Sequence, residues 1–365
     1  MGQRILGLTL CAMLAGCGGE PPFGGDVGED TDGGAVDGGG DGGGIMRDGI
    51  PPGTTAPDPA TGIFRREATS TEDVSDGNGF AQGIRYNSAD DTFVVDNLPF
   101  DGAENAPYVR GQAVSSLNGY AVYEAVAQYP DTATTRQINQ FTHRAIYGVS
   151  RNRDANGVPE TQFAIVRTGA YRDYGFGGFI YQREGDVTLP VAGQALYNGR
   201  GAGIRDFGGT GGFEYSTSSV QIAIDFEDFN AGTNTSSGAV DGFVFNRRVF
   251  DRNGTEITTQ VIDRINAENT ASLTALPTAI FEIRTGNLDQ NGEIIGRLSS
   301  AFTNDNGDRV DYEEGNYYAV IAGDTVAGTD EIVGIVVMEN TADPIADSVR
   351  DTTGFIVYRG DPVAP

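Results

Sequence analysis

Beyond Thr61 the chain alternates apolar and polar residues in short runs that Gly, Asn and Asp separate. In residues 220–226 the even positions are apolar, and the odd positions are Gln221, Ala223 and Asp225. An antiparallel strand with one buried face has this period of two. The pattern predicts an all-β protein, in which a barrel and a sandwich fit equally well. The predicted strands are residues 83–86, 92–98, 120–125, 143–150, 162–167, 178–183, 193–197, 213–215, 220–226, 242–250, 280–284, 293–299, 317–322, 331–338 and 354–358.

Two segments have helical spacing instead. Val261, Ile262 and Ile265 fall on one face of a helix, which predicts a helix over about residues 259–273. Ile138 and Phe141 stand three residues apart, which predicts a second helix over residues 132–142.

Two glycine clusters, at residues 199–203 and 208–212, interrupt the strand pattern. Neither is followed by the Lys-Ser/Thr pair of a phosphate-binding loop. We interpret both clusters as glycines of loops or barrel corners.

The first sixteen residues have the pattern of a signal peptide, with Arg4 ahead of a short apolar core over residues 5–14. A membrane-spanning helix needs about twenty apolar residues, so this core is too short to span. The following box, Leu-Ala-Gly-Cys ending at Cys17, resembles the lipobox of bacterial lipoproteins. This resemblance implies that Cys17 is acylated and that outer-membrane lipid holds the protein through these acyl chains. An ordinary secretory signal is the alternative.

Residues 17–60 are predicted to form a disordered tether behind this anchor. Residues 18–60 contain fifteen glycines, six prolines and nine acidic residues, with Arg47 as the sole base. Such a segment has too little apolar surface to form a core. Gly18 follows the lipidated cysteine, whereas an aspartate there would indicate retention at the inner membrane. We therefore expect sorting to the outer membrane.

The net charge of the chain limits the classes of partner that it can bind. Arginine supplies all 24 basic residues, and 51 acidic residues give a formal net charge of -27. This sign disfavours nucleic acid as a partner. One histidine, two cysteines and no tryptophan leave little material for metal sites or a Ser-His-Asp triad. No catalytic residue, metal ligand or cofactor is predicted.

The tetrad Asp/Asn-x-Asn-Gly occurs five times, at residues 76–79, 154–157, 251–254, 289–292 and 304–307. Asn-Gly tolerates positive φ at both central positions of a turn, so the tetrads are interpreted as tips of type I′ hairpins. Calcium is the alternative, because such a tetrad can fill positions three to six of an EF-hand loop. The two tetrads with Asn at loop position one have Phe163 or Leu298 at position twelve, where calcium needs an acid.

Other residues have both a chemical and a structural interpretation. Asp225, Glu227 and Asp228 could supply the carboxylate pair of a glycoside hydrolase, in which case Asp225→Asn abolishes hydrolysis. A solvated strand end is the simpler interpretation in a chain with 51 acids. His143, the single histidine, is interpreted as a structural hydrogen-bonding residue rather than a haem or metal ligand.

The segment at residues 171–181 combines aromatic residues, arginine and glycine. Tyr171, Arg172, Tyr174 and Phe176 are the candidate binding residues, because aromatic and arginine side chains are common interface anchors. Ordinary aromatic-glycine alternation in a β-hairpin is the alternative.

Several segments of the second half resemble one known family. Residues 195–199 read Ala-Leu-Tyr-Asn-Gly, residues 220–226 end in Asp-Phe, and residues 316–323 and 331–334 contain an aromatic-Gly and a Glu-x-x-Gly pattern. These resemble barrel strands of transferrin-binding protein B-like surface lipoproteins, over about residues 189–360. The resemblance implies an eight-stranded antiparallel β-barrel behind a smaller β-rich handle, displayed on the outer membrane and binding a ligand. The family's closing Gly-Pro is absent and only one handle-barrel unit fits, so transferrin itself is not implied.

Together these patterns predict four regions: a signal peptide (1–16), a lipidated tether (17–60), a β-rich handle (61–188) and an antiparallel barrel (189–365). The predicted function is that of a non-catalytic, lipid-anchored outer-membrane protein whose loops recognise an unknown protein or small ligand. The alternative is a periplasm-facing structural lipoprotein that scaffolds an envelope assembly.

Overall fold

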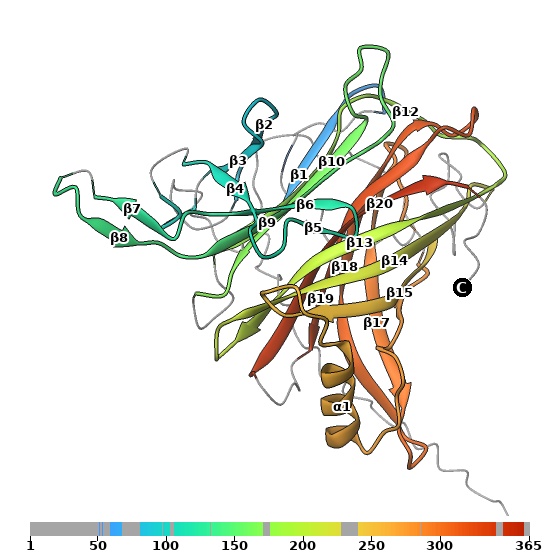
Figure 1. Cartoon of the computed structure of the whole chain (residues 1–365). Helices are drawn as coiled ribbons and strands as arrows, with labels where there is room; N and C mark the ends of the chain where they lie inside the picture. The colour runs from blue at the N-terminus through green and yellow to red at the C-terminus, as the bar shows by residue number, and fades with distance from the viewer. Residues whose placement is uncertain are drawn as a thin grey trace, which may run out of the picture.

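The computed structural model describes residues 51, 53, 59–67, 81–96, 98–102, 106–131, 133–170, 176–227, 240–284, 286–340 and 346–360. The predicted signal peptide, Cys17 and nearly all of the predicted tether lie outside these residues. The described strands form two large sheets and one separate hairpin. Figure 1 shows the hairpin, β7 (Gln128–Pro130) and β8 (Gln137–Asn139), projecting at the left.

The first sheet, here called the handle sheet, has nine strands in the order β1-β11-β10-β9-β6-β4-β3-β2, with β5 paired to β6. Its paired strands run antiparallel, as the alternating pattern predicts. The strands are β1 (Ile63–Arg66), β2 (Ile84–Asn87), β3 (Thr92–Val95), β4 (Tyr108–Arg110), β5 (Ser116–Leu117), β6 (Tyr120–Glu124), β9 (His143–Val149), β10 (Thr161–Thr168) and β11 (Gly177–Arg183).

The second sheet closes into an eight-stranded antiparallel barrel in the order β18-β17-β16-β15-β14-β13-β20-β19, because β19 at one end of this order pairs with β18 at the other. The all-β prediction with an eight-stranded barrel is confirmed. Closure removes the exposed edges that an open sheet would present. The barrel strands are β13 (Gln194–Gly208), β14 (Phe213–Asp225), β15 (Val240–Phe250), β16 (Ala279–Phe281), β17 (Glu293–Thr303), β18 (Arg309–Asp324), β19 (Glu331–Asn340) and β20 (Ser348–Arg359); the short β12 (Val187–Thr188) lies parallel to β18.

The predicted alternation in residues 220–226 matches the core. Val220, Ile222, Ile224 and Phe226 are all buried in one hydrophobic cluster inside the barrel. The interior becomes polar toward the end where α1 lies, and there Arg247 forms a buried ion pair with Glu313 at 2.6 Å. Such a pair stays buried at low cost only because each charge has its partner.

Residues 199–203 are not a loop, so that half of the prediction is wrong. They lie in the middle of β13, paired on both sides with β14 and β20. A Cβ on Gly203 would stand 2.3 Å from Thr353 Oγ1 and 2.5 Å from Ser216 Oγ, so no larger side chain fits. The glycines here allow side chains of neighbouring strands to fill the barrel. The second cluster does form a turn, between β13 and β14.

One of the two predicted helices is present. Helix α1 (Thr258–Asn269) buries Val261, Ile262 and Ile265, as their spacing predicts. The predicted helix over residues 132–142 is wrong, because Gln137–Asn139 is strand β8. Two apolar residues three apart are too weak a signal when the preceding strand, β7, offers backbone partners. In the described part of the chain, helices long and apolar enough to cross a membrane are absent.

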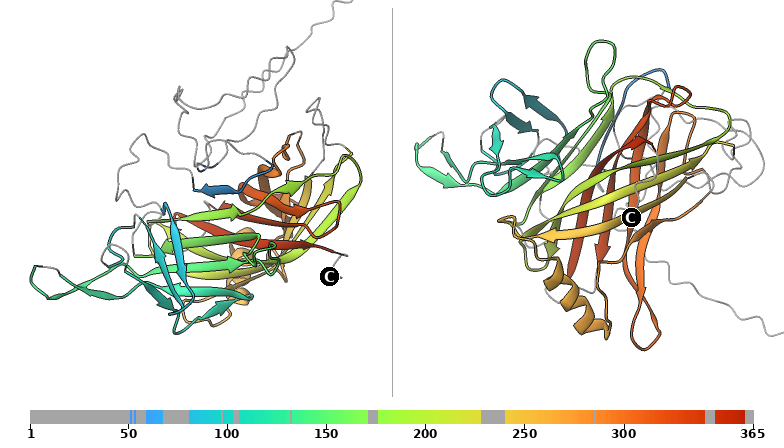
Figure 2. Two further views of the ribbon diagram at one scale, coloured as in Figure 1. Left: turned by 90° about the horizontal axis from the view of Figure 1, so that it is seen from above. Right: turned by 45° about the vertical axis from the view of Figure 1, so that its right-hand side comes forward.

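The handle sheet packs against the barrel wall (Figure 2). Apolar side chains of both sheets form one buried cluster, with Ile146 and Ile165 from the handle and Ile335 and Ile356 from the barrel. Arg65 of β1 also forms a buried ion pair with Glu293 of β17 at 2.8 Å. The two sheets therefore share a core instead of meeting through a linker alone.

Candidate functional site

Three of the four candidate binding residues, Tyr171, Arg172 and Tyr174, lie outside the described residues, as does Cys17. Phe176 is described, and its ring stacks on Phe141 with the ring centroids 6.0 Å apart. It packs against the core on the outer side of the handle sheet. The binding role of this segment stays a prediction.

The described tetrads are turns at strand ends, but their type differs from the prediction. In residues 154–157 only Gly157 has positive φ, and its N–H donates to the Asp154 carbonyl at 3.0 Å. Asp154 Oδ1 also accepts the N–H groups of Asn156 and Val158, each at 2.8 Å. This is a type I turn followed by a G1 bulge, which needs one positive φ instead of two.

The tetrads at 251–254, 289–292 and 304–307 repeat this geometry. The first tetrad, 76–79, lies outside the described residues. Backbone hydrogen bonds hold the pKa of the exposed Asp154 and Asp251 carboxyls below their usual value. The first residue of each tetrad therefore has a structural use within its own turn. Groups of three or more metal-binding side chains suited to an ion are absent among the described residues.

Asp225 and His143 have structural surroundings. Asp225 ends β14, where its carboxylate accepts the Gln194 amide at 2.7 Å and the Glu227 N–H at 3.0 Å. Asp228 lies outside the described residues. His143 is fully buried, and its ring lies beside the rings of Tyr108 and Phe141, with centroids 6.4 and 6.2 Å away. Its interpretation as a structural hydrogen-bonding residue stays a prediction. Burial lowers the pKa of His143 to about 4, which keeps the ring neutral.

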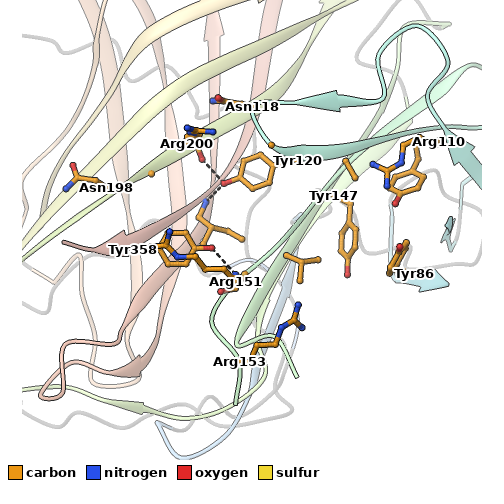
Figure 3. Close-up of a pocket in the computed structure, with 17 residues that line it drawn as sticks. Tyr86, Arg110, Asn118, Tyr120, Tyr147, Arg151, Arg153, Asn198, Arg200 and Tyr358 are labelled. Carbon is orange, nitrogen blue, oxygen red and sulfur yellow. Dashed lines mark hydrogen bonds between the residues drawn. The ribbon is translucent and has the colours of Figure 1, made fainter. Parts of the chain in front are cut away.

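The structure brings together a different set of residues, in a cleft between the handle sheet and the barrel (Figure 3). The cleft has a volume of about 750 Å³. Its charged and aromatic lining residues are Tyr86, Arg110, Tyr120, Tyr123, Tyr147, Arg151, Arg153, Arg200 and Tyr358, and its amide side chains are Asn118 and Asn198.

The β5–β6 hairpin fixes one side of this cleft. Its turn residues Asn118 and Gly119 both have positive φ, the type I′ geometry predicted for the tetrads. The Asn118 side-chain amide donates to the carbonyls of Gly201 and Ser218, both at 2.9 Å. The hairpin tip is therefore bonded to β13 and β14 of the barrel.

The next residue, Tyr120, joins the handle to two barrel strands. Its hydroxyl donates to the Arg200 carbonyl at 2.8 Å and accepts the Ile356 N–H at 3.0 Å (Figure 3). Burial raises the pKa of Tyr120 well above its usual value, so the hydroxyl keeps its proton. The cleft floor at this point is rigidly held.

A second wall consists of tyrosines organised by Asp91. The Asp91 carboxylate accepts the Tyr123 hydroxyl at 2.8 Å and both Nε and an Nη of Arg110, at 3.0 and 2.9 Å. These bonds lower the pKa of Asp91, with the Arg110 hydrogen bond as the largest cause. Tyr86 adds its ring to this wall, 5.4 Å from the ring of Tyr147. Each ring is therefore held before a ligand arrives.

Three other arginines of the cleft have no carboxylate partner within the described part of the chain. The Arg151 guanidinium lies over the Tyr358 ring, 3.8 Å from its centroid. The backbone N–H of Arg151 donates to the Tyr358 hydroxyl at 3.1 Å. Arg153 has one long hydrogen bond, to the Gly157 carbonyl at 3.4 Å. Arg200 is exposed at the barrel side. These guanidinium groups are available to a ligand.

Sequence patterns did not predict this site. Its residues come from β2, β4, β6, β9, β13, β20 and the turns next to them. Only Asn198, Gly199 and Arg200 among them stand in a motif, residues 195–199 or 199–203, and neither motif was predicted to bind a ligand. The Asn-Gly pair at residues 118–119, flanked by apolar Leu117 and Tyr120, was the one local signal for its hairpin.

Comparison with known proteins finds likeness in structure alone. No protein-family model matches the chain, and no curated protein matches its sequence. A variant of transferrin-binding protein B from Haemophilus parasuis aligns with 68% of this chain and 39% of its own, at 13% identity and a TM-score of 0.33. A surface lipoprotein aligns with 59% of this chain and 81% of its own, at 13% identity and a TM-score of 0.25. The chain thus spans well under half of the length of the first of these proteins. The description of its fold rests on its own strand pairing.

Proposed function

We propose that this chain is a lipid-anchored outer-membrane protein that captures an extracellular ligand in the cleft between its handle sheet and its barrel. The observation that carries the proposal is the cleft itself, in which the described lining contains four arginines and five tyrosines but no Asp or Glu. The chain as a whole has a net charge of -27, so a lining with arginines and without carboxylates differs from it in the sign of its charge. Large preformed clefts with a few convergent polar groups are typical of ligand sites.

The anchor follows from the lipobox-like segment that ends at Cys17. Several acyl chains on one residue hold a protein stably to a membrane. Replacing Cys17→Ser should move the protein from the membrane fraction to the soluble fraction. The matched control is Cys11→Ser, inside the predicted signal peptide, which should leave the protein membrane-bound. Equal fractionation of both variants would contradict lipidation at Cys17.

Orientation is tested by adding protease to intact and to lysed cells and following the folded part with an antibody. Cleavage in intact cells supports capture of an extracellular ligand. Protection until lysis would refute surface display and favour the alternative, a periplasm-facing scaffold for an envelope assembly.

The cleft is tested with a fluorescent reporter, since the chain has no tryptophan. Tyr86→Trp puts an indole at the cleft, because Tyr86 is 38% exposed there. Ligand from spent growth medium should shift the emission of this variant. The control is Ile283→Trp, which is 53% exposed and is not a lining residue, and its emission should stay constant.

A further inference from the structure

A second cavity extends the cleft along the handle sheet. It has a volume of about 530 Å³ and shares Tyr86, Tyr147, Val149 and Arg153 with the first. Its other lining residues include the amides of Gln162 and Gln182, and its described lining contains no Asp or Glu. The two cavities adjoin at these four residues and are here together called the groove. Their combined volume exceeds the roughly 300–1,000 Å³ of a pocket for a single small molecule, so there is space for a chain of linked units.

The charge of the groove indicates an anionic ligand. Arg151, Arg153 and Arg200 lack carboxylate partners within the described residues, whereas Arg65, Arg167 and Arg247 each have one. A planar guanidinium binds a carboxylate through two parallel hydrogen bonds. A carboxylate of the ligand would supply these three arginines with the partner that they lack among the described residues.

The neutral side chains of the groove suit sugars better than a peptide. The described lining of both cavities contains no Leu, Met, Phe or Trp. Its apolar side chains are few and small to medium in size: Ile84, Ala121, Val149, Pro159 and the fully buried Ile356. The large aromatic or Met anchors of a typical peptide interface are therefore missing from this lining, and its aromatic residues are all tyrosines. Tyrosine rings offer flat faces for the C–H face of a sugar ring. The Gln162 and Gln182 amides each donate one N–H to Glu184. An amide has two N–H donors, so the second donor of each can bind a sugar hydroxyl.

We propose that the groove binds an acidic oligosaccharide, a chain of sugars that carry carboxylate groups. The inference rests on the proposed function and names the class of its ligand. Arg153 lies where the two cavities meet and binds a carboxylate there, Arg200 binds one at the barrel side, and the tyrosines stack on the rings between them.

The test uses the lipidated full-length mature protein in detergent and isothermal titration calorimetry. The probes are hexamers of galacturonate and of mannuronate, the methyl esters of both hexamers, and a hexameric glutamate peptide. At least one uronate hexamer should bind, and its neutral ester and the glutamate peptide should each bind at least tenfold more weakly. Binding should weaken as salt rises, because the exposed charges are screened.

Variants locate the binding. Arg153→Gln and Arg200→Gln should each weaken uronate binding about tenfold, since each removes a hydrogen bond to a charged group. The matched control is Arg309→Gln, whose guanidinium pairs with Asp311 at an exposed site outside the groove, and it should bind like the parent.

Three results would overturn the inference. The first is equal affinity for the hexamer and its neutral ester, the second is tighter binding of the glutamate peptide, and the third is no binding of either uronate. Each leaves the proposed function standing if the Trp reporter still responds to growth medium. Conversely, protease protection in intact cells refutes surface capture without changing the calorimetry.

Discussion

Glu331 is a single residue whose ionisation is coupled to the junction between handle and barrel. It is fully buried in β19, and its carboxyl accepts the hydroxyls of Ser150 and Thr161 from the handle, both at 2.5 Å. Burial is the largest cause that raises the pKa of Glu331, to about 7, and repulsion from Glu160 raises it further. The two hydrogen bonds and the nearby Arg151 lower the pKa by less than burial raises it. The folded protein therefore keeps a proton here that the unfolded chain releases at lower pH.

This shift predicts how stability depends on pH. Between about pH 4.5 and pH 7 the folded state binds the proton and the unfolded state does not, so the Glu331 contribution to the free energy of unfolding falls as pH rises. The total loss is on the order of 3 kcal/mol. Glu331→Gln should match the parent near pH 4.5 and exceed its stability at pH 8 by up to this amount, as urea unfolding would measure. If the free energies of unfolding of the two proteins changed with pH in parallel, Glu331 would not cause this pH dependence.

At the scale of elements, two kinds of Asn-Gly turn differ in what asparagine does. Asn118 has a φ of 50° and bonds the handle to the barrel, whereas Asn253 in the 251–254 turn lies outside the positive-φ region. Alanine at position 118 would adopt left-handed backbone at a cost of about 1 kcal/mol and lose two hydrogen bonds.

Asn118→Ala should therefore lower the free energy of unfolding by about 2–3 kcal/mol. The matched control, Asn253→Ala, removes an asparagine from an equivalent dipeptide and should cost less than about 1 kcal/mol. Chemical denaturation of both variants is the measurement, and equal costs would show that the hairpin contact with the barrel contributes nothing.

The stability of helix α1 depends more on its packing against the barrel than on capping at its ends. Ile257 at its N-cap makes no side-chain capping bond, and the apolar face with Ile265 packs on Val249 and Phe302. Ile265→Ala should destabilise the protein by about 2–5 kcal/mol, because it leaves a cavity under the helix. The exposed Gln260→Ala should change stability by less than about 0.5 kcal/mol. Thermal unfolding followed by circular dichroism separates the two cases.

At the scale of the whole molecule, handle and barrel should unfold together. They share an apolar cluster, and buried ion pairs and hydrogen bonds cross between them, including Arg65 to Glu293 and Arg167 to Thr352. Calorimetry should therefore show one transition. Two separated transitions would show that the interface is weak.

Arg65→Met tests the ion pair at this interface. It should cost about 3–5 kcal/mol, because Glu293 is left buried without its partner. Replacing both residues, Arg65→Met with Glu293→Leu, should recover most of this loss, since the remaining charge is then gone. Arg309→Met breaks the exposed pair with Asp311 and should cost less than about 1 kcal/mol. Similar losses for both single variants would contradict a role for burial.

The sequence alone determined the fold class and much of the strand content, because alternation with period two follows from burying one face of a strand. It also located α1 from three apolar residues at helical spacing. The local patterns failed where a neighbour decides the outcome. Residues 199–203 continue β13 because they pair with strands on both sides, and Gly199, Gly201 and Gly203 have no room for a Cβ there. The type of the tetrad turns depends on which residue takes positive φ.

Only the tertiary structure decided the candidate site. Tyr86, Tyr120, Arg153, Arg200 and Tyr358 come from segments up to 272 residues apart that meet because the handle sheet packs on the barrel wall. Each residue alone is an ordinary strand or turn residue, and neither spacing nor composition links them. A cleft between two sheets depends on how their faces dock, and that docking depends on contacts distant in sequence, such as Arg65 with Glu293.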